Sequence, residues 1–192
     1  MSNTLVVNGH PDKESFCAAL ADAYAGGSAE AGIRTTTLHL ADLEFDPNLR
    51  FGYRVRTELE PGLVRARQLI AEANHLVVVY PIWWAAAPAL LKGFFDRTFL
   101  PGFAYKPREN SALHDKLLVG KTARLIVTMD APTWYDLLVY RNAGIVSLKR
   151  GTLEFCGIKP VRVTTFGQVK HSKEALRKKW LGDVRKLGRA GR

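Results

Sequence analysis

Short apolar segments alternate with segments of helical periodicity along the whole chain of 192 residues. The apolar segments, rich in β-branched residues, predict strands at residues 4–8, 33–40, 75–80, 123–128 and 161–166. Apolar residues at helical spacing predict helices at residues 15–31, 63–73, 88–99, within 136–155 and at the C-terminal end. Strands separated by helices favour a parallel sheet covered by helices on both faces.

We therefore predict one α/β domain, residues 1–192, with five parallel strands in the flavodoxin-like order 2-1-3-4-5. Ligands of such sheets bind beyond the carboxyl ends of the strands, near the switch point between the first and third strands. This rule selects the loops that follow Asn8, Tyr80 and Thr128. Segments 43–62 and 101–121 are long and weakly patterned, which is more typical of functional loops than of idle ones.

The net charge of +10 raises the question of a nucleic-acid partner. Residues 170–192 hold nine Lys or Arg and two acidic residues, so +7 of the +10 lies there. The same segment carries an apolar stripe at helical spacing, formed by Leu176, Trp180, Leu181, Val184 and Leu187. We interpret the basic residues as the solvated face of an amphipathic helix rather than a nucleic-acid surface, although their field can attract anionic ligands.

The two cysteines, Cys17 and Cys156, lie far apart in the sequence and show no zinc-ligand spacing. This pattern favours a reducing compartment. The N-terminal sequence lacks the features of a signal peptide, and no apolar stretch approaches the ~20 residues needed to cross a membrane. We expect a cytoplasmic protein without a membrane-inserted segment.

The first of the three loops is "NGHPDKESF", residues 8–16. Gly9 permits a tight turn, and Ser15 can cap the next helix. Free N–H groups at that helix start form an anion site, so we favour phosphate binding here over a plain connecting turn. Neither GxGxxG nor Walker spacing is present. A thiol in the first helical turn can have a lowered pKa, but for Cys17 we favour a small apolar filler.

The second loop follows the strand in "YPIWWAAAPALLKGFFDR", residues 80–97. If Pro81 ends the strand, Trp83 and Trp84 lie at the sheet edge, where their rings can wall a pocket or stack on a flat ligand. Their backbone groups can hydrogen-bond the edge of a heterocycle, and the three alanines that follow leave space beside it. The alternative is that the two rings are core aromatics, one of them packed against the next helix.

The third loop is "TMDAPTWYD", residues 128–136. Asp130 can act as a general base or cap a turn, and we favour the cap because no spacing supports a catalytic dyad. Trp134 and Tyr135 add aromatic surface. No nucleophile–base constellation and no ligand cluster for a metal is evident, so the chemistry would come from a bound cofactor.

Together these loops resemble those of the NAD(P)H:quinone oxidoreductases, which are flavodoxin-like flavoproteins. The chain is most similar to small bacterial members, relatives of modulators of drug activity and of ancillary subunits of glutathione-gated potassium channels. The likeness covers nearly the whole chain and is strongest in "GHPDKESF", "YPIWWAAAPALLKGFFDRTFLPGFAY" and "GTLEFCGIKPV". It implies a homodimer that binds FMN or FAD and passes two electrons, as hydride, from NAD(P)H to the flavin and then to a quinone in ping-pong half-reactions.

The resemblance also implies roles for individual residues. The flavin phosphate and ribityl chain would be held by His10, Ser15, Phe16 and Cys17. The isoalloxazine would contact Pro81, Ile82, Trp83 and Trp84, and its pyrimidine side Thr128, Met129, Asp130 and Ala131. Tyr105, in "GFAY", matches a family tyrosine that the other subunit places near the substrate mouth, and Trp134 is a further candidate for substrate contact.

One departure concerns the third loop, where many family members have a Gly pair followed by a Tyr and a His implicated in hydride transfer. Here the loop reads "TMDAP", and Tyr135 and Tyr140 follow without a His. The Gly pair gives backbone access to the flavin, which Asp130 and Ala131 cannot copy freely. Tyr135 and Tyr140 are therefore the candidate catalytic residues, without a defined proton relay.

Segment 43–62 is shorter than in the FAD-binding animal members, which favours FMN over FAD. We expect an FMN-dependent NAD(P)H oxidoreductase that reduces quinones or related electrophiles. An alternative is a flavin-binding regulatory subunit of a membrane transporter, with the basic C-terminal helix in peripheral contact with it. A one-electron flavodoxin carrier fits less well, because such carriers tend to be acidic and lack the tryptophan-rich loop.

Overall fold

The computed structural model describes residues 3–191 and contains a parallel five-stranded sheet in the order β2-β1-β3-β6-β7. This is the predicted order 2-1-3-4-5 with the strands renumbered along the chain. Each predicted strand is present, with ends that differ by at most one residue. The strands are β1 (Asn3–Asn8), β2 (Arg34–His39), β3 (His75–Pro81), β6 (Thr122–Thr128) and β7 (Val161–Phe166).

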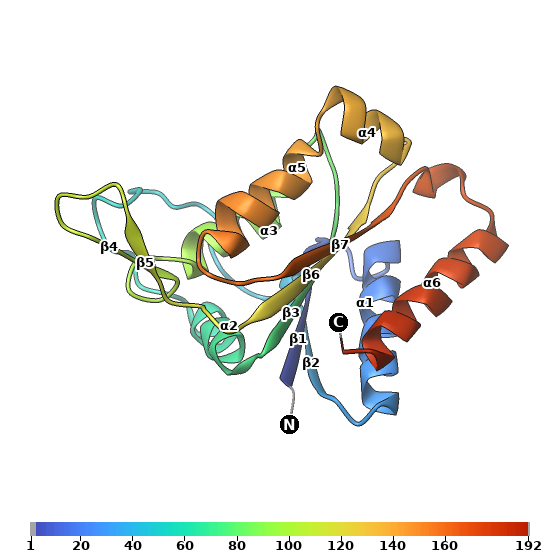
Figure 1. The fold of residues 1–192 in the computed structure, drawn as a ribbon, viewed down its shortest axis with the longest axis horizontal. Helices are drawn as coiled ribbons and strands as arrows, with labels where there is room; N and C mark the ends of the chain where they lie inside the picture. Colours follow the sequence, from blue (N-terminus) through green and yellow to red (C-terminus); the bar gives the residue numbers. More distant parts are fainter. Residues whose placement is uncertain (1–2, 192) are drawn as a thin grey trace.

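Helices cover both faces of the sheet (Figure 1). On one face lie α1 (Phe16–Glu30) and α6 (Glu174–Arg189). The other face is covered by α2 (Pro61–Glu72), α3 (Ala89–Thr98), α5 (Ala143–Val146) and the π-helix η2 (Ser147–Glu154). The shorter elements are η1 (Leu40–Asp42), α4 (Thr133–Val139) and η3 (Val169–His171).

Successive residues of β1 belong to different cores, because neighbouring side chains of a strand point to opposite faces. Leu5 and Val7 pack with Leu63 of α2 and Phe94 of α3, whereas Val6 packs in the core beneath α1 and α6. This alternation within a continuously apolar strand is what a sheet buried on both faces requires.

The α6 helix lies close against α1. A Cβ atom at Gly27 would lie 2.0 Å from the carbonyl oxygen of Arg185, and one at Gly188 would lie 2.1 Å from that of Tyr24. The predicted apolar stripe of α6 faces α1 and the sheet, except that Leu176 is 40% exposed.

Pro81 is the last residue of strand β3 and pairs with Thr128, as the prediction that it ends the strand requires. Two other local predictions need correction. The helix predicted within residues 136–155 is divided among α4, α5 and η2. Segment 101–121 contains an unpredicted antiparallel pair, β4 (Tyr105–Pro107) with β5 (His114–Lys116).

Segment 43–60 is anchored by the side chain of Arg97, which is only 1% exposed. Its guanidinium donates to the backbone carbonyls of Asp46 and Glu58 and to the carboxylate of Glu60. No helix within residues 3–191 has the length and apolar character to span a membrane.

Candidate functional site

The three loops selected from the sequence surround one cavity of about 490 Å³ at the carboxyl edge of the sheet. We call it the edge cavity. It is lined by all the residues expected to bind a cofactor, namely His10, Ser15, Phe16, Cys17, Pro81, Ile82, Trp83, Trp84, Thr128, Met129, Asp130 and Ala131. Ala85, the first of the three alanines expected to leave space beside a ligand, also lines it, whereas sequence reasoning had not singled out Asp12, Asp136 and Val169 as part of this site.

The first loop presents the N-terminus of α1 to this cavity. The Ser15 hydroxyl accepts a hydrogen bond from the Ala18 N–H at 3.2 Å, which confirms the predicted cap. Within residues 3–191 no group accepts from the N–H of Phe16 or Cys17. Two free donors at a helix N-terminus are suited to a phosphate group.

His10 is held as a neutral ring in the same loop. Its Nδ1 accepts from the Asp12 N–H at 2.9 Å, and its ring meets that of Trp83 edge-on at 5.3 Å. Partial burial lowers the His10 pKa, and the Asp12 charge opposes this only in part. The uncharged ring therefore places a single Nε2–H donor at its free end.

Cys17 is not an activated thiol. Its Sγ lies 3.2 Å from the Thr128 hydroxyl, and burial raises the thiol pKa to about 11. The lowering that a helix N-terminus can produce is outweighed by desolvation. The interpretation of Cys17 as a small buried filler is confirmed, and its contact with Thr128 joins the first loop to the third.

The second loop is a tight hairpin turn. Trp83 and Ala86 exchange both backbone hydrogen bonds at 3.0 Å, and the two residues between them, Trp84 and Ala85, have φ values of 51° and 55°. This is the left-handed pair of a type I′ turn, in which Asn and Gly are the usual residues. Close packing supports it: a Cβ atom at Gly144 would lie 2.9 Å from the Ala85 carbonyl oxygen.

The turn changes what the tryptophans can do. The Trp83 N–H is consumed by Ala86, so the expectation that it binds a ligand is wrong, whereas Trp84 keeps a free N–H within the described chain. The Trp84 side chain is fully exposed, and that of Trp83 packs on His10. Neither ring is a core aromatic, so both are free to wall the cavity.

The third loop supplies backbone donors without glycine. The Asp130 carboxylate accepts from the Lys170 N–H at 2.9 Å, so Asp130 secures the loop to η3, as the turn-cap interpretation anticipated. No acceptor in the described part of the chain takes the N–H of Asp130 or Ala131. Both have ordinary φ values, so backbone access to a ligand does not depend on a Gly pair here.

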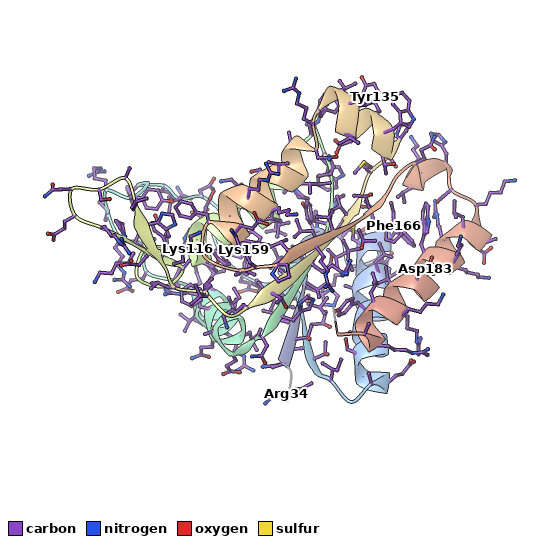
Figure 2. All side chains as sticks on the ribbon, viewed as in Figure 1. Arg34, Lys116, Tyr135, Lys159, Phe166 and Asp183 are labelled. Atoms are coloured by element: carbon purple, nitrogen blue, oxygen red, sulfur yellow. The ribbon has the colours of Figure 1, made fainter. Side chains whose placement is uncertain are left out.

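Helix α4 divides the remaining predicted residues between different cavities. Tyr140 reaches the edge cavity, together with Asp136 one turn earlier. Tyr135 does not line it, although its ring lies 5.6 Å from that of Tyr140; Figure 2 shows Tyr135 at the periphery of the molecule. Trp134 lines a separate groove beside β7, so its expected place at this site is not supported.

Tyr105 lies in a neighbouring cavity of about 560 Å³, which shares Ala85 with the edge cavity. Its ring packs edge-on against Phe155 at 5.3 Å. Tyr105 of this chain therefore does not line the edge cavity. No group of three or more metal-ligating side chains occurs in residues 3–191.

A family model described as "Flavodoxin-like fold" matches residues 2–187. The chain belongs to this flavodoxin-like family. An uncharacterized NAD(P)H oxidoreductase of Haemophilus influenzae is 28% identical over 87% of this chain and 84% of its own. NAD(P)H dehydrogenase [quinone] 1 of Cavia porcellus is 27% identical over 82% of this chain and 65% of its own.

A solved structure of an FMN-dependent NADH-azoreductase from Bacillus anthracis, in complex with FMN, covers 98% of this flavodoxin-like chain and 98% of its own. Its TM-score is 0.72 and its identity 17%, so it demonstrates the shared fold. These relatives are named as oxidoreductases, and they lend no support to the alternative of a transporter subunit.

Proposed function

We propose that this flavodoxin-like protein is a flavin-dependent NAD(P)H oxidoreductase that reduces quinones or related electrophiles by two electrons. The observation that carries the proposal is the convergence of three loops, separated in sequence, on one cavity with the donors a flavin needs. The relatives named as NAD(P)H oxidoreductase and quinone dehydrogenase support the same assignment.

The residues fit a flavin from end to end. The free N–H groups of Phe16 and Cys17 would hold its phosphate, and those of Asp130 and Ala131 the polar edge of its ring system. The rings of Trp83 and Trp84 would wall the ring system on another side. A bound flavin accepts hydride from NAD(P)H and passes it to an acceptor. The chain contributes binding, orientation and exclusion of water.

We propose FMN as the flavin, in line with the short 43–62 segment and with the FMN bound by the structurally similar azoreductase. We also propose a single domain over residues 1–192, a homodimer in which Tyr105 serves the partner's site, and a cytoplasmic location. Tyr140 is the stronger of the two tyrosine candidates for catalysis, because it reaches the edge cavity and Tyr135 does not.

The absorption spectrum of the purified or FMN-reconstituted protein tests this function. Flavin bands that bleach on adding NAD(P)H and return on adding a quinone are expected, and denaturation should release FMN. Release of FAD would replace FMN with the larger cofactor. A protein that binds neither flavin would overturn the enzyme assignment and leave the fold unchanged.

The proposed flavin site in the edge cavity can be tested at its two exposed tryptophans, Trp83 and Trp84. Trp84→Ala should weaken flavin binding by about fivefold or more, because an aromatic contact contributes roughly 1 kcal/mol. Trp134→Ala is the matched control, since Trp134 is also exposed but lines the groove beside β7. Equal losses in both variants would place the flavin elsewhere.

A further inference from the structure

Asp136 stands apart from the other acidic residues of the edge cavity. Asp12 and Asp130 are exposed, and each accepts a hydrogen bond from a backbone N–H, Asp12 from Glu14 of its own loop and Asp130 from Lys170 of η3. Asp136 also lines the cavity, yet it is only 3% exposed. Two of the three carboxylates thus hold loops in place, and the third is buried at the ligand site.

No structural task within residues 3–191 accounts for the Asp136 carboxylate. Its Oδ2 is buried without a hydrogen-bond partner, and no ion pair involves it. The Asp136 side chain does not cap α4, because no backbone N–H of this helix donates to it. The N–H of Asp136 itself donates to the Pro132 carbonyl oxygen. Burying an unpaired carboxylate is unfavourable, so such groups are kept where they serve a function.

The backbone holds Asp136 in a fixed position. Its carbonyl oxygen accepts from the N–H groups of Tyr140 and Asn142 at 3.2 and 3.0 Å, which closes the C-terminal end of α4. Tyr140 lies beside it on the cavity wall. The side chain is therefore presented to the cavity by a short, closed helix rather than by a free loop.

The surroundings of Asp136 favour its neutral form. Burial raises its carboxyl pKa. Tyr80 of β3 is close enough for the Asp136 charge to raise the phenol pKa, and its own hydroxyl is buried without a partner. The titratable groups facing this region come from β3, from α4 and from across the cavity: Tyr80, Tyr135, Tyr140, His10, Asp12 and Asp130. None carries a positive charge at neutral pH that would hold Asp136 ionised.

Quinone reduction needs such an acid. In NAD(P)H + H⁺ + quinone → NAD(P)⁺ + hydroquinone, the hydride supplies both electrons and one hydrogen. The second hydrogen is a proton, and it must reach the oxygen on which negative charge develops. A buried carboxyl group, whose charged form is disfavoured by desolvation, can donate it.

We propose that Asp136 is the proton donor of the edge cavity, giving its carboxyl proton to the acceptor oxygen and recovering one from water. This inference rests on the proposed function. It assigns a residue to the proton transfer, for which the sequence alone indicated only the candidates Tyr135 and Tyr140 and no histidine. Tyr140, on the same face, would position the acceptor.

The titration of Asp136 in the flavin-free protein gives the first test, and it does not depend on turnover. The side-chain carboxyl carbon, assigned through the Asp136 backbone, should titrate by ¹³C NMR above the ordinary value of about 3.9. Asp183 of α6, which is half-exposed and paired with Lys186, is the aspartate to compare with it in the same spectra. A normal midpoint for Asp136 would overturn the proposal even if the protein proves to be a quinone reductase.

Asp136→Asn gives the second test, because it keeps the shape and removes the acid. Quinone turnover should fall about 10²- to 10⁴-fold, while FMN affinity and the reduction of ferricyanide, which takes up no proton, stay as in the wild type. The wild-type loss of quinone turnover at high pH should vanish in the variant. Unchanged quinone turnover, or equal losses with both acceptors, would overturn the proposal.

Asp183→Asn is the matched control and should behave as the wild type throughout. If Asp136→Asn does not fold, the NMR titration of the wild type decides alone. A wild-type protein that binds no flavin would instead refute the proposed function. That failure is distinguishable from failure of the Asp136 proposal, because the titration is measured without flavin.

Discussion

The Ile82 N–H donates to the Thr128 carbonyl oxygen at 2.7 Å, one residue beyond the end of the β3–β6 pairing. The second and third loops therefore leave the sheet from a shared, fixed point. The Cys17 thiol, 3.2 Å from the Thr128 hydroxyl, ties the first loop to the same place. Three loops from distant parts of the sequence are thus held as one rigid rim around the edge cavity.

We expect the hairpin turn of the second loop to lower the stability of the protein while it supports flavin binding. Trp84 and Ala85 both hold positive φ values, and a left-handed conformation costs a residue with a Cβ about 1–2 kcal/mol. Trp84→Asn combined with Ala85→Gly should raise the free energy of unfolding by about 1 kcal/mol, measured by urea denaturation. The same variant should bind flavin more weakly, since it removes an aromatic wall.

Ala86→Gly serves as the control for that variant. Ala86 ends the same turn but has an ordinary φ value, so glycine there only frees the unfolded chain and should lower stability. A loss of stability in both variants would show that the left-handed pair is not strained.

The sheet was predictable because its five strands carry runs of apolar, β-branched residues that few other structures accommodate. The loops selected by strand order also proved right, since parallel strands end at a common edge. The turn at Trp84 was not predictable, because neither Trp nor Ala favours positive φ. It depends on close packing against Gly144, which is far away in sequence.

The residues of α4 that face the cavity were equally unpredictable from the sequence. The sequence "TWYDLLVY" is apolar almost all round, so no periodicity tells which residues face the cavity. Only the helix start at Thr133 places Asp136 and Tyr140 inward and Trp134 toward β7. The spacing of four residues between Asp136 and Tyr140 indicates that they share one face of a helix. Without the exact start of the helix, it does not tell whether that face is turned toward the cavity.

Close packing of α6 on α1 predicts opposite effects of alanine at two glycines of one helix. Gly188→Ala should lower the free energy of unfolding by about 1–3 kcal/mol or more, because the new Cβ meets the Tyr24 carbonyl oxygen at 2.1 Å. Gly182→Ala should raise it by up to about 1 kcal/mol, since no atom lies within 4 Å and alanine favours helix. Thermal denaturation of both variants provides the comparison; equal effects would contradict the packing.

The lowered pKa of the buried His75 leads us to expect a loss of stability as the pH falls. Burial, aided by the charges of Arg124 and Arg162, lowers its pKa to about 4, against about 6.5 in the unfolded chain. The unfolded state takes up the proton first as the pH falls. The free energy of unfolding therefore decreases between about pH 6.5 and pH 4, and the loss at pH 5 is about 2 kcal/mol.

His75→Asn isolates that effect. The amide can keep the hydrogen bond that His75 Nδ1 makes with the Thr122 hydroxyl at 2.6 Å, but it does not titrate. Between pH 7.5 and pH 5 the wild type should lose about 2 kcal/mol more than the variant in urea denaturation. Parallel losses would show that another group controls the acid sensitivity.

Arg97 should prove the most damaging of the charged residues on α3 to replace. Arg97→Met leaves the carbonyls of Asp46 and Glu58 and the carboxylate of Glu60 without their shared donor, at a cost of about 3–5 kcal/mol. Lys92→Met, which removes an exposed pair with Asp96 on the same helix, should cost less than about 0.5 kcal/mol. Limited proteolysis should cut Arg97→Met first within residues 46–60; if that segment stays protected, a different contact anchors it.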